Sequence, residues 1–384
     1  MQKKHASQPP PHEPKVPKVL IYLFGSLGDT IVAIPALRAV RRHFRDAELT
    51  LLQNVPSSGN IVKASQVLSE DLVDGSLEYA GQPGRLNGLL DFYRLRREIR
   101  RGAFQTAVYL VISERPARSV ARDKFFFRTC GITDFYGFHA FSQAELYPLD
   151  ENGLPAMTDS EAVRKLKRLE TDGIKSNAAD FQNPWLTFSP AEIEKSKVWL
   201  ADRRRQPNAR LISIAPGCKT LANVWASENF IEIGQRLMAL GGVELMVTGG
   251  RAEIEIAERM VAEWGAGIAA AGALSVRESG ALLSLCDFHI GLDTGATHLA
   301  AAAGTRCFAL YGERNNPGHW YPAGSGQTLV FHPVECAGCR LLACPLPDHP
   351  CMRGISVEAV WENLRKFMAD FERTREFPPQ IIRV

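Results

Sequence analysis

The stretch Gly291-Leu-Asp293-Thr294-Gly295-Ala-Thr-His298-Leu-Ala-Ala-Ala-Ala-Gly304 decides the fold class. An apolar, strand-like run precedes it, and its alanine-rich part is typical of a helix. A strand that turns directly into a helix is a unit of α/β domains, and the free N–H groups of such a helix suit a phosphate. Gly295 permits close approach of the backbone, Thr294 offers a hydroxyl, and Asp293 can hold a sugar hydroxyl. The alternative is an ordinary turn in which Asp293 or Thr294 only caps the helix.

A second strand–turn–helix unit lies near the N-terminus. Residues 18–24 are typical of a buried strand, and apolar residues at three- and four-residue spacing through 31–44 predict a helix packed on a sheet. The glycines between them match neither GxGxxG nor a P-loop, since no GKS or GKT follows. Asp29 then stands at the carboxyl end of the first strand, where ligands bind in open α/β sheets.

Strands and helices alternate along the rest of the chain, which predicts two α/β halves with parallel sheets and right-handed crossovers. Strands are predicted at 18–24, 48–53, 106–111, 211–215, 243–248, 288–292 and 307–311. Helices in the second half are predicted at 228–240, 253–264, 276–286, 297–303 and 357–371. The stretch 173–190, with its Asn-Pro and Ser-Pro pairs, is expected to connect the halves.

The composition is that of a globular protein, with 45% hydrophobic and 23% charged residues in a 384-residue chain. No apolar run approaches a bilayer span, and the N-terminus lacks the hydrophobic core of a signal peptide, so we expect a cytoplasmic protein. The proline-rich residues 1–17 are predicted to be a disordered tail. Basic series at 94–101 and 115–128 favour either solvated helix faces or contact with an anionic acceptor or membrane surface.

Four sequence blocks occur in an order that is informative beyond any one of them. They are Leu-Phe-Gly-Ser-Leu-Gly-Asp-Thr-Ile…Pro-Ala-Leu-Arg-Ala at 23–39, Ala-Pro-Gly-Cys…Trp-Ala-Ser-Glu-Asn-Phe at 215–230, Thr-Gly-Gly-Arg-Ala-Glu at 248–253, and Asp-Thr-Gly…His at 293–298. This order resembles the heptosyltransferases of glycosyltransferase family 9. The resemblance runs from about residue 18 to 368, although 55–188 matches only in general layout.

The resemblance implies a GT-B fold, in which two Rossmann-like domains with parallel sheets face each other across a cleft. The expected division is a tail at 1–17, an acceptor-side domain at 18–180, a nucleotide-sugar domain at 181–356, and a C-terminal segment at 357–384. The helix of that last segment is expected to cross back to the N-terminal domain.

The family transfers a heptose, typically from an ADP-sugar, to an acceptor hydroxyl with inversion at the anomeric carbon. By resemblance, Asp29 is the general base that removes the acceptor proton. Its alternative role is only to cap the helix that it opens. Ser26 and Gly28 belong to the same loop and are expected to contact substrate. The implied acceptor is a lipopolysaccharide-core glycan, with a protein acceptor as an alternative. We expect contact with the inner face of the cytoplasmic membrane and no nucleic-acid partner.

The nucleotide-sugar site is implied in the second half. Its expected members are Gly217, Cys218, Lys219, Asn223, Glu253, Leu274, Asp293, Thr294, Gly295 and His298. Glu253 matches a ribose-binding glutamate, although a first-turn glutamate also suits a helix dipole. Leu274 matches a position whose backbone meets the base.

One position departs from the family. The family usually has a lysine two residues before the tryptophan, where this chain has Asn223 before Trp225. Asparagine can hydrogen-bond but cannot neutralise charge. Lys219 in the same loop is the expected substitute; without it the donor is unusual or the enzyme is weak.

Eight cysteines divide into two groups. Cys130, Cys218, Cys286 and Cys307 are scattered, as reduced buried thiols are. Cys336, Cys339, Cys344 and Cys351 form a C-x2-C-x4-C-x6-C cluster with ligand-like spacing for structural zinc or iron. Some relatives that glycosylate autotransporter proteins are associated with an iron held by clustered cysteines. Two disulfides or four free thiols are the alternatives. No cofactor is expected in catalysis.

Two other function classes stay open. A nonhydrolytic sugar-nucleotide epimerase of the same fold would need a second acid–base pair in the cleft, which the sequence does not place. A catalytically inactive nucleotide-sugar-binding protein would account for Asn223.

Overall fold

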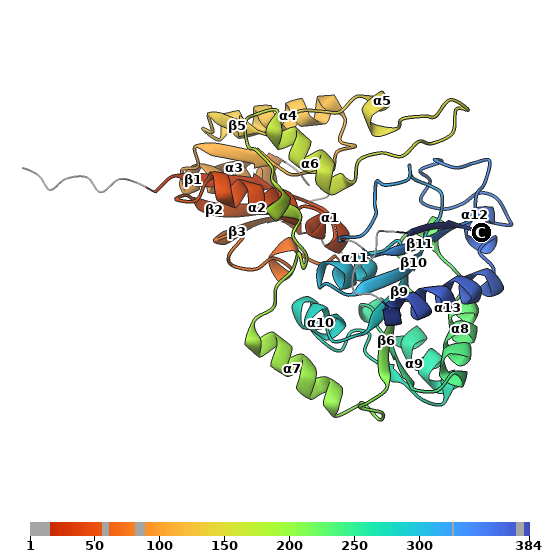
Figure 1. The fold of residues 1–384 in the computed structure, drawn as a ribbon. Coiled ribbons are helices and arrows are strands. Elements are labelled where there is room, and N and C mark those ends of the chain that lie inside the picture. The colour runs from red at the N-terminus through yellow and green to blue at the C-terminus, as the bar shows by residue number, and fades with distance from the viewer. Residues whose placement is uncertain (1–15, 56–60, 81–88, 325, 374–379) are drawn as a thin grey trace, which may run out of the picture.

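Two lobes, each built on a parallel sheet, make up this protein in a computed structural model (Figure 1). The structure describes residues 16–55, 61–80, 89–324, 326–373 and 380–384. The tail predicted at 1–17 lies almost entirely outside these residues. The predicted α/β class with two parallel sheets is confirmed.

The first lobe has a five-stranded sheet in the order β3-β2-β1-β4-β5, with all neighbours parallel. Its strands are β1 (Lys18–Tyr22), β2 (Glu48–Val55), β3 (Gly75–Ala80), β4 (Thr106–Tyr109) and β5 (Asp134–Tyr136). Its helices are α1 (Leu27–Ile31), α2 (Ile34–His43), α3 (Leu89–Gly102), α4 (Ala117–Thr129), α5 (Gln143–Leu146) and α6 (Glu161–Glu170). The central strands β1 and β4 are mostly apolar and almost entirely buried, as expected where helices cover both faces of a sheet.

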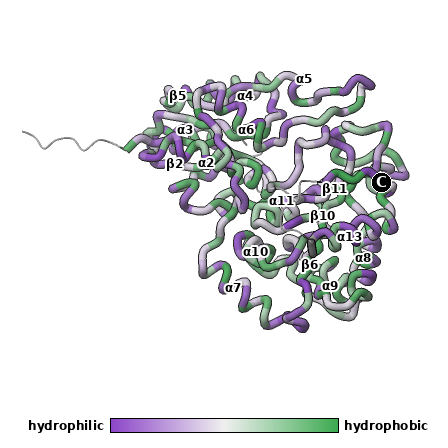
Figure 2. Tube along the Cα trace, viewed as in Figure 1, coloured by the Kyte–Doolittle hydropathy of each residue, from purple (hydrophilic) through white to green (hydrophobic). Residues whose placement is uncertain are grey.

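The second lobe has a seven-stranded sheet in the order β12-β11-β10-β9-β6-β7-β8. Its strands are β6 (Arg210–Ile214), β7 (Val243–Val247), β8 (Ile268–Ala269), β9 (Phe288–Leu292), β10 (Arg306–Leu310), β11 (Thr328–Phe331) and β12 (Gln380–Arg383). Its helices are α7 (Pro190–Ala201), α8 (Ser227–Ala239), α9 (Ile254–Trp264), α10 (Val276–Leu283), α11 (Gly295–Ala302), α12 (Pro350–Arg353) and α13 (Val357–Arg373). Figure 2 shows hydrophobic residues along β10 and β11.

The C-terminal segment differs from our expectation that its helix crosses back to the first lobe. Val360, Leu364 and Phe367 of α13 join the apolar core of the second sheet. The Phe367 ring packs on Phe288, with ring centroids 5.3 Å apart. The chain then adds β12 to the same sheet, beside β11. The apolar face of α13 is thus buried on its own lobe.

No helix in the described ranges is both long and apolar enough to cross a bilayer.

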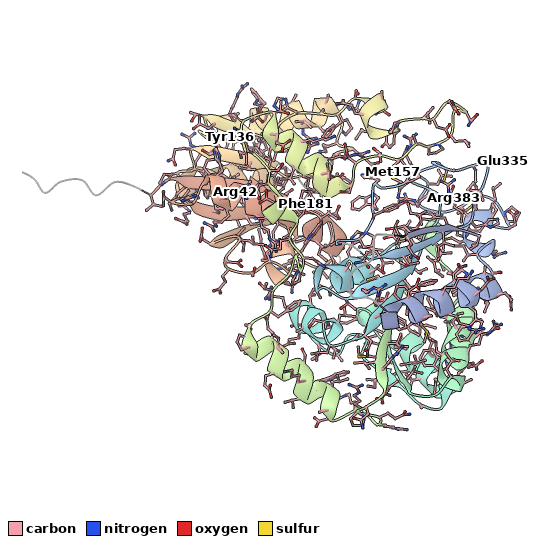
Figure 3. The ribbon with its side chains drawn as sticks, in the orientation of Figure 1. Arg42, Tyr136, Met157, Phe181, Glu335 and Arg383 are labelled. Atoms are coloured by element: carbon pink, nitrogen blue, oxygen red, sulfur yellow. The ribbon has the colours of Figure 1, made fainter. Side chains whose placement is uncertain are left out.

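The segment between α6 and α7 runs along α2 and is fixed to it by arginines. Arg38 donates to the carbonyl oxygens of residues 180, 182, 184 and 185. Arg42 pairs with the buried Asp180, at 2.9 Å from its Nη2 to Oδ2. Figure 3 places Arg42 and Phe181 on this side of the first lobe. The connection is therefore held against the first sheet's outer helix.

The two lobes contact each other at several places along their boundary. Helix α1 lies against α11, and the alanines of α11 share one apolar core with the first sheet. On the other side, Met157, which Figure 3 labels at the boundary, lies close to Gly318 of the second lobe. Backbone bonds of 2.9 Å join Thr158 N to Pro317 O and Glu161 N to His319 O. These contacts bring the carboxyl ends of both sheets to one boundary.

Candidate active site

The residues singled out from the sequence lie at the topological switch points of the two sheets. In the first sheet the strand order reverses beside β1. The chain after β1 carries Ser26, the N-cap residue of α1, and then Gly28 and Asp29 in the first turn of α1. In the second sheet the strand order reverses between β6 and β9, whose loops carry Gly217–Cys218 and Asp293–Thr294. Open α/β sheets bind ligands at such points.

The Asp29 carboxylate folds back over the turn that begins α1. Its Oδ2 accepts a hydrogen bond from the Ser26 N–H at 2.7 Å. Gly25 has φ +135°, and a Cβ on it would lie 2.4 Å from the Asp29 Cγ, so glycine is needed there. Burial raises the pKa of Asp29, while the Ser26 N–H and Lys165 oppose that rise. The capping interaction is therefore present, and it does not preclude a role as base.

The start of α11 leaves polar atoms without partners among the described residues. Thr294 is its N-cap residue, yet the side chain makes no capping bond. The buried atoms Thr294 Oγ1, His298 Nδ1 and Asn223 Oδ1 lack hydrogen-bond partners. Burial lowers the pKa of His298 to about 4, so its ring is neutral at pH 7. Buried polar atoms are nearly always paired, so three unpaired ones in neighbouring loops indicate a polar ligand.

Asn223 is used to hold Asp293. Its Nδ2 donates to Asp293 Oδ2 at 3.0 Å. Burial raises the pKa of Asp293 to about 6, against the opposing effects of Arg314 and of the Asn223 hydrogen bond. An amide at this position fixes the carboxylate without neutralising it.

The loop after β6 packs directly on Glu253. A Cβ on Gly217 would lie 2.3 Å from the Glu253 Cγ, so only glycine permits this approach. Glu253 Oε2 also accepts from the Gly250 N–H at 2.7 Å, which is the capping role considered from the sequence. Burial raises the pKa of Cys218 to about 12, so this thiol is neutral. Leu274 is partly buried beneath the same edge of the sheet, against β7 and β8.

The two switch points meet across the lobe boundary. A Cβ on Gly28 would lie 3.4 Å from His298 Cδ2, and one on Gly295 would lie 3.0 Å from the Leu27 Cβ. Any larger residue at position 295 would crowd Leu27 of the other lobe, a constraint that the sequence did not reveal. The loop of Asp29 and the start of α11 therefore face each other.

A buried charge network behind Asp29 was missed by the sequence analysis. Glu161 accepts from Ser113 N at 2.8 Å and pairs with Lys165 Nζ at 3.0 Å. Lys165 Nζ also donates to the Leu110 carbonyl at the end of β4, at 2.8 Å. His319 of the second lobe lies 3.1 Å from Glu161 Oε2. The charged positions of α6 recur with helical spacing, which resembles a solvated face and concealed their burial.

Besides Lys219, a second cation lies at this edge of the sheet. Lys219 is exposed, and none of the described interactions ties it to Asp293. Arg314, in the loop after β10, acts electrostatically on both Asp293 and Cys218. Because β10 neighbours β9, the strand-end rule that identified Asp293 could also have identified Arg314.

The four clustered cysteines do not form a metal site here. Among the described residues, no three His, Cys, Asp or Glu side chains are grouped so that they could hold a metal ion. All four are free thiols; Cys336 and Cys339 are exposed and Cys351 is buried. The predicted tetrahedral arrangement is thus not formed in this structure.

Comparison with known proteins agrees with this geometry. Residues 191–349 match the sequence model of glycosyltransferase family 9 (heptosyltransferase). The resemblance to glycosyltransferase family 9 is therefore confirmed. A lipooligosaccharide heptosyltransferase 2 of Campylobacter jejuni subsp. jejuni serotype O:2 is 22% identical, over 91% of this chain and 98% of that protein.

Solved structures give the same fold. A family 9 glycosyl transferase from Veillonella parvula DSM 2008 superimposes with a TM-score of 0.70 and 18% identity, covering 93% of this chain and 99% of that one. The E. coli ADP-heptose lps heptosyltransferase II gives a TM-score of 0.64 and 17% identity, covering 92% and 99%. The predicted GT-B fold of two Rossmann-like domains is confirmed.

Proposed function

We propose that this protein is an inverting heptosyltransferase that uses ADP-heptose as donor and a lipooligosaccharide-type glycan as acceptor. The observation that carries the proposal is the contact of α1, the helix that contains Asp29, with the start of α11 across the lobe boundary. One side offers a carboxylate, and the other offers a helix N-terminus with unpaired polar atoms. The names of the Campylobacter and E. coli proteins supply the donor and acceptor classes.

In this reaction the Asp29 carboxylate takes the proton of the acceptor hydroxyl. The acceptor oxygen then forms a bond to the anomeric carbon on the face opposite the leaving group, while the bond from that carbon to the diphosphate oxygen breaks. ADP departs with the bonding electrons, and inversion follows from opposite-face attack. Burial of Asp29 suits this role, because a raised pKa brings the carboxyl nearer to working pH as a proton acceptor.

The second lobe would stabilise the departing diphosphate. The N–H groups at the start of α11 and the positive end of its dipole favour added negative charge. Thr294 Oγ1 and the neutral His298 ring offer further hydrogen bonds. Glu253, fixed beside Gly217, is placed to accept from a ribose hydroxyl. These roles need no metal ion at the diphosphate.

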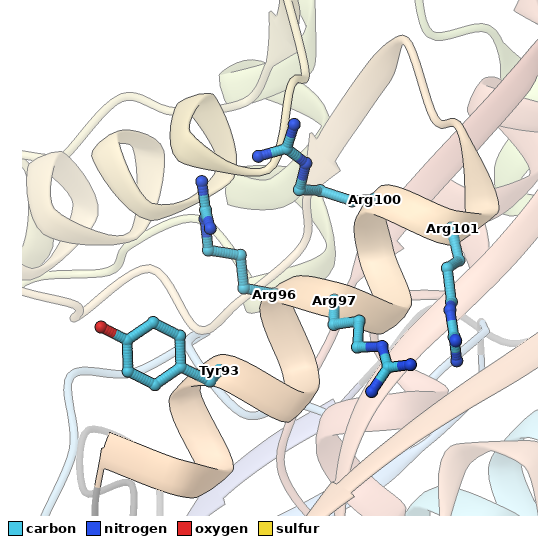
Figure 4. A pocket seen from close by; sticks show the side chains of 5 residues that line it. All are labelled: Tyr93, Arg96, Arg97, Arg100 and Arg101. Carbon is cyan, nitrogen blue, oxygen red and sulfur yellow. The ribbon is translucent and has the colours of Figure 1, made fainter.

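A basic face on the first lobe supports a lipid-linked, anionic acceptor. A shallow hollow on α3 is lined by Tyr93, Arg96, Arg97, Arg100 and Arg101 (Figure 4). Leu90 and Tyr93 beside these arginines are largely exposed, at 73% and 59%. Cations interleaved with exposed apolar side chains suit peripheral contact with an anionic membrane surface.

The test is transfer from ADP-heptose to a heptose-deficient lipooligosaccharide core, with ADP release measured with and without acceptor. A transferase releases ADP only with acceptor. An epimerase interconverts the donor without acceptor, and an inactive binding protein does neither; either result contradicts the proposal.

Asp29→Asn is the matched variant for the base. We expect it to lower kcat by about 10²–10⁴, the usual contribution of a general base, and to leave ADP affinity nearly unchanged. Asp46→Asn, at an exposed aspartate of the same lobe, is the control. Near-wild-type turnover by Asp29→Asn would remove Asp29 from this role.

A further inference from the structure

We propose that Arg314 supplies the positive charge at the donor diphosphate that Asn223 cannot supply, and that the loop 336–349 orients its guanidinium. This inference rests on the proposed function, because it assumes a diphosphate at the start of α11. It adds a binding residue and a support that the sequence did not reveal.

The first step is the placement of three strand ends. Strands β6, β9 and β10 are neighbours in the sheet, with Ile214 opposite Ile290 and Leu310 opposite Leu292. Parallel neighbours deliver their following loops to one edge. The loops after β6, β9 and β10 carry Cys218, Asp293 and Arg314, respectively. Arg314 therefore lies at the same edge of the sheet as the start of α11.

The second step is the contact between the Arg314 loop and the position of the missing lysine. A Cβ on Gly312 would lie 3.3 Å from Asn223 Oδ1 and 3.2 Å from the Ala222 carbonyl oxygen. The loop after β10 therefore packs on the turn that holds Asn223. Two residues later, Arg314 acts electrostatically on Asp293 and on Cys218, which flank that turn. Arg314 thus provides a cation from the loop next to the Asn223 turn, whereas Lys219 is exposed.

The third step is how Arg314 is held. Its Nε donates to the Leu341 carbonyl at 2.8 Å, and its Nη2 donates to the Arg340 carbonyl at 3.1 Å. The Arg340 N–H returns a bond to the Arg314 carbonyl at 2.8 Å. The two side-chain bonds fix the plane of the guanidinium, and the backbone bond joins the two loops. A fixed fork is pre-organised for a phosphate, because little further side-chain freedom is lost on binding.

The same loop also supports the Asn223 turn. Ala222 N donates to the Leu342 carbonyl at 3.0 Å, and His349 Nε2 lies 3.0 Å from the Ala222 carbonyl oxygen. The Arg340 guanidinium stacks 3.9 Å from the Tyr147 ring centroid in the first lobe. One loop thus contacts the cation, the donor turn and the opposite lobe. The conformation of this loop therefore determines where Arg314 and the Asn223 turn lie at the proposed diphosphate site.

The experiment compares ADP affinity of the full-length wild type, Arg314→Gln and Arg314→Lys by calorimetry at several salt concentrations. We expect Arg314→Gln to weaken ADP about 10- to 100-fold, as for a lost charge-assisted hydrogen bond, and to flatten the salt dependence. Arg314→Lys should recover part of the affinity. Asn223→Lys added to Arg314→Gln should also recover part, because it restores a cation to the same site.

Lys197→Gln is the matched control, since it removes one positive charge from an exposed position of the second lobe that lies outside the proposed site. We expect its ADP affinity and salt dependence to equal those of the wild type. Wild-type ADP binding by folded Arg314→Gln overturns the inference and leaves the proposed function standing. If the wild type binds neither ADP nor ADP-heptose, the proposed function fails as well. If Arg314→Gln does not fold, Arg314→Lys and Lys219→Gln are compared with the wild type instead. The inference is overturned if Arg314→Lys has the ADP affinity and salt dependence of the wild type while Lys219→Gln binds ADP more weakly.

Discussion

Glu161 and His319 belong to different lobes, yet Glu161 Oε2 and His319 Nε2 are 3.1 Å apart, and both side chains are fully buried. Burial by itself raises the pKa of the Glu161 carboxyl, but Lys165, His319 and Ser113 outweigh it and hold that pKa well below its ordinary value. Glu161 is thus an anion at neutral pH that ties the two lobes together behind Asp29.

Glu161→Gln should destabilise the protein strongly. It leaves Lys165 buried without its counter-charge, and removal of one partner from a buried ion pair costs about 3–5 kcal/mol. The free energy of unfolding is measured by urea denaturation. Glu362→Gln, an exposed residue of α13, is the control and should change little. A carboxyl whose pKa is lowered by folding stabilises the folded state at pH values above its unfolded pKa, and this stabilisation is lost as the pH falls through the folded pKa. Wild type and Glu161→Gln should therefore converge in acid, and parallel pH curves would contradict this assignment.

Thr294→Val tests the diphosphate site with little disturbance. The substitution is nearly isosteric, and it removes a hydroxyl whose Oγ1 is buried without a described partner. We expect unfolding stability to be unchanged or raised, because no hydrogen bond is lost in the free protein. ADP affinity should fall about 3- to 30-fold, and calorimetry measures it. Gly295→Val is less informative, because its side chain would meet Leu27. Unchanged ADP binding would place the phosphate elsewhere.

The sequence predicts the central strands well because long apolar runs bounded by glycine carry a strong signal. Strand 288–292 is predicted to the residue, and β6, β7 and β10 to within one residue at each end. The prediction missed β3, β5, β8, β11 and β12, which are short or lie at or near the sheet edges. Local pattern is weak there, because pairing with a neighbour rather than composition makes these residues extended.

The residues of the candidate site also divide into those that the sequence predicts and those that it does not. The strand-end rule and the sequence blocks bring Asp29, Asp293 and Thr294 to one boundary, as the structure shows. They could not supply Glu161 or the orientation of the Arg314 side chain, because both depend on contacts from other segments. Arg314 acquires its orientation from carbonyl groups of residues 340 and 341, and backbone carbonyls have no sequence signature.

Asp293→Asn should change how stability depends on pH. Burial raises the Asp293 pKa to about 6, above an ordinary aspartate near 3.9. The folded state then binds the proton more tightly, so this group lowers stability as pH rises from about 4 to about 6. The total is on the order of 2–3 kcal/mol. Denaturation at pH 4.5 and at pH 7 measures the free energy of unfolding of both proteins. The stability of the variant relative to the wild type should be greater at pH 7 than at pH 4.5. Equal differences at both values would show that Asp293 does not titrate there.

The arginines of α3 should govern binding to anionic vesicles. Arg97 and Arg101 are exposed, and a cation near an anionic surface contributes about 1 kcal/mol. Reversing both to glutamate should weaken sedimentation with phosphatidylglycerol vesicles at least about tenfold at low salt. Lys197→Glu with Arg205→Glu makes the same change of net charge on the second lobe. Equal loss in both double variants would indicate net charge alone, not a binding face.

The cysteine loop gives the last prediction. Burial and the neighbouring cysteines raise the pKa of Cys336 and of Cys351. A bound cation would relieve that mutual repulsion and order a loop with few apolar residues. The four thiols are not grouped for a metal in the described structure, so binding requires them to move together. If they do, elemental analysis of protein purified without chelator should find zinc or iron near one equivalent per chain.

Serine at both Cys336 and Cys339 should abolish that metal and lower the melting temperature. Because the loop orients Arg314, ADP affinity should fall as well, although the remaining contacts of α11 are untouched. Cys130→Ser with Cys286→Ser changes two buried thiols outside the loop and should leave the metal content unchanged. Four titratable thiols, no metal and wild-type stability would show that the spacing misled the prediction. The hydrogen bonds of residues 340 and 341 would then hold Arg314 without help from a metal.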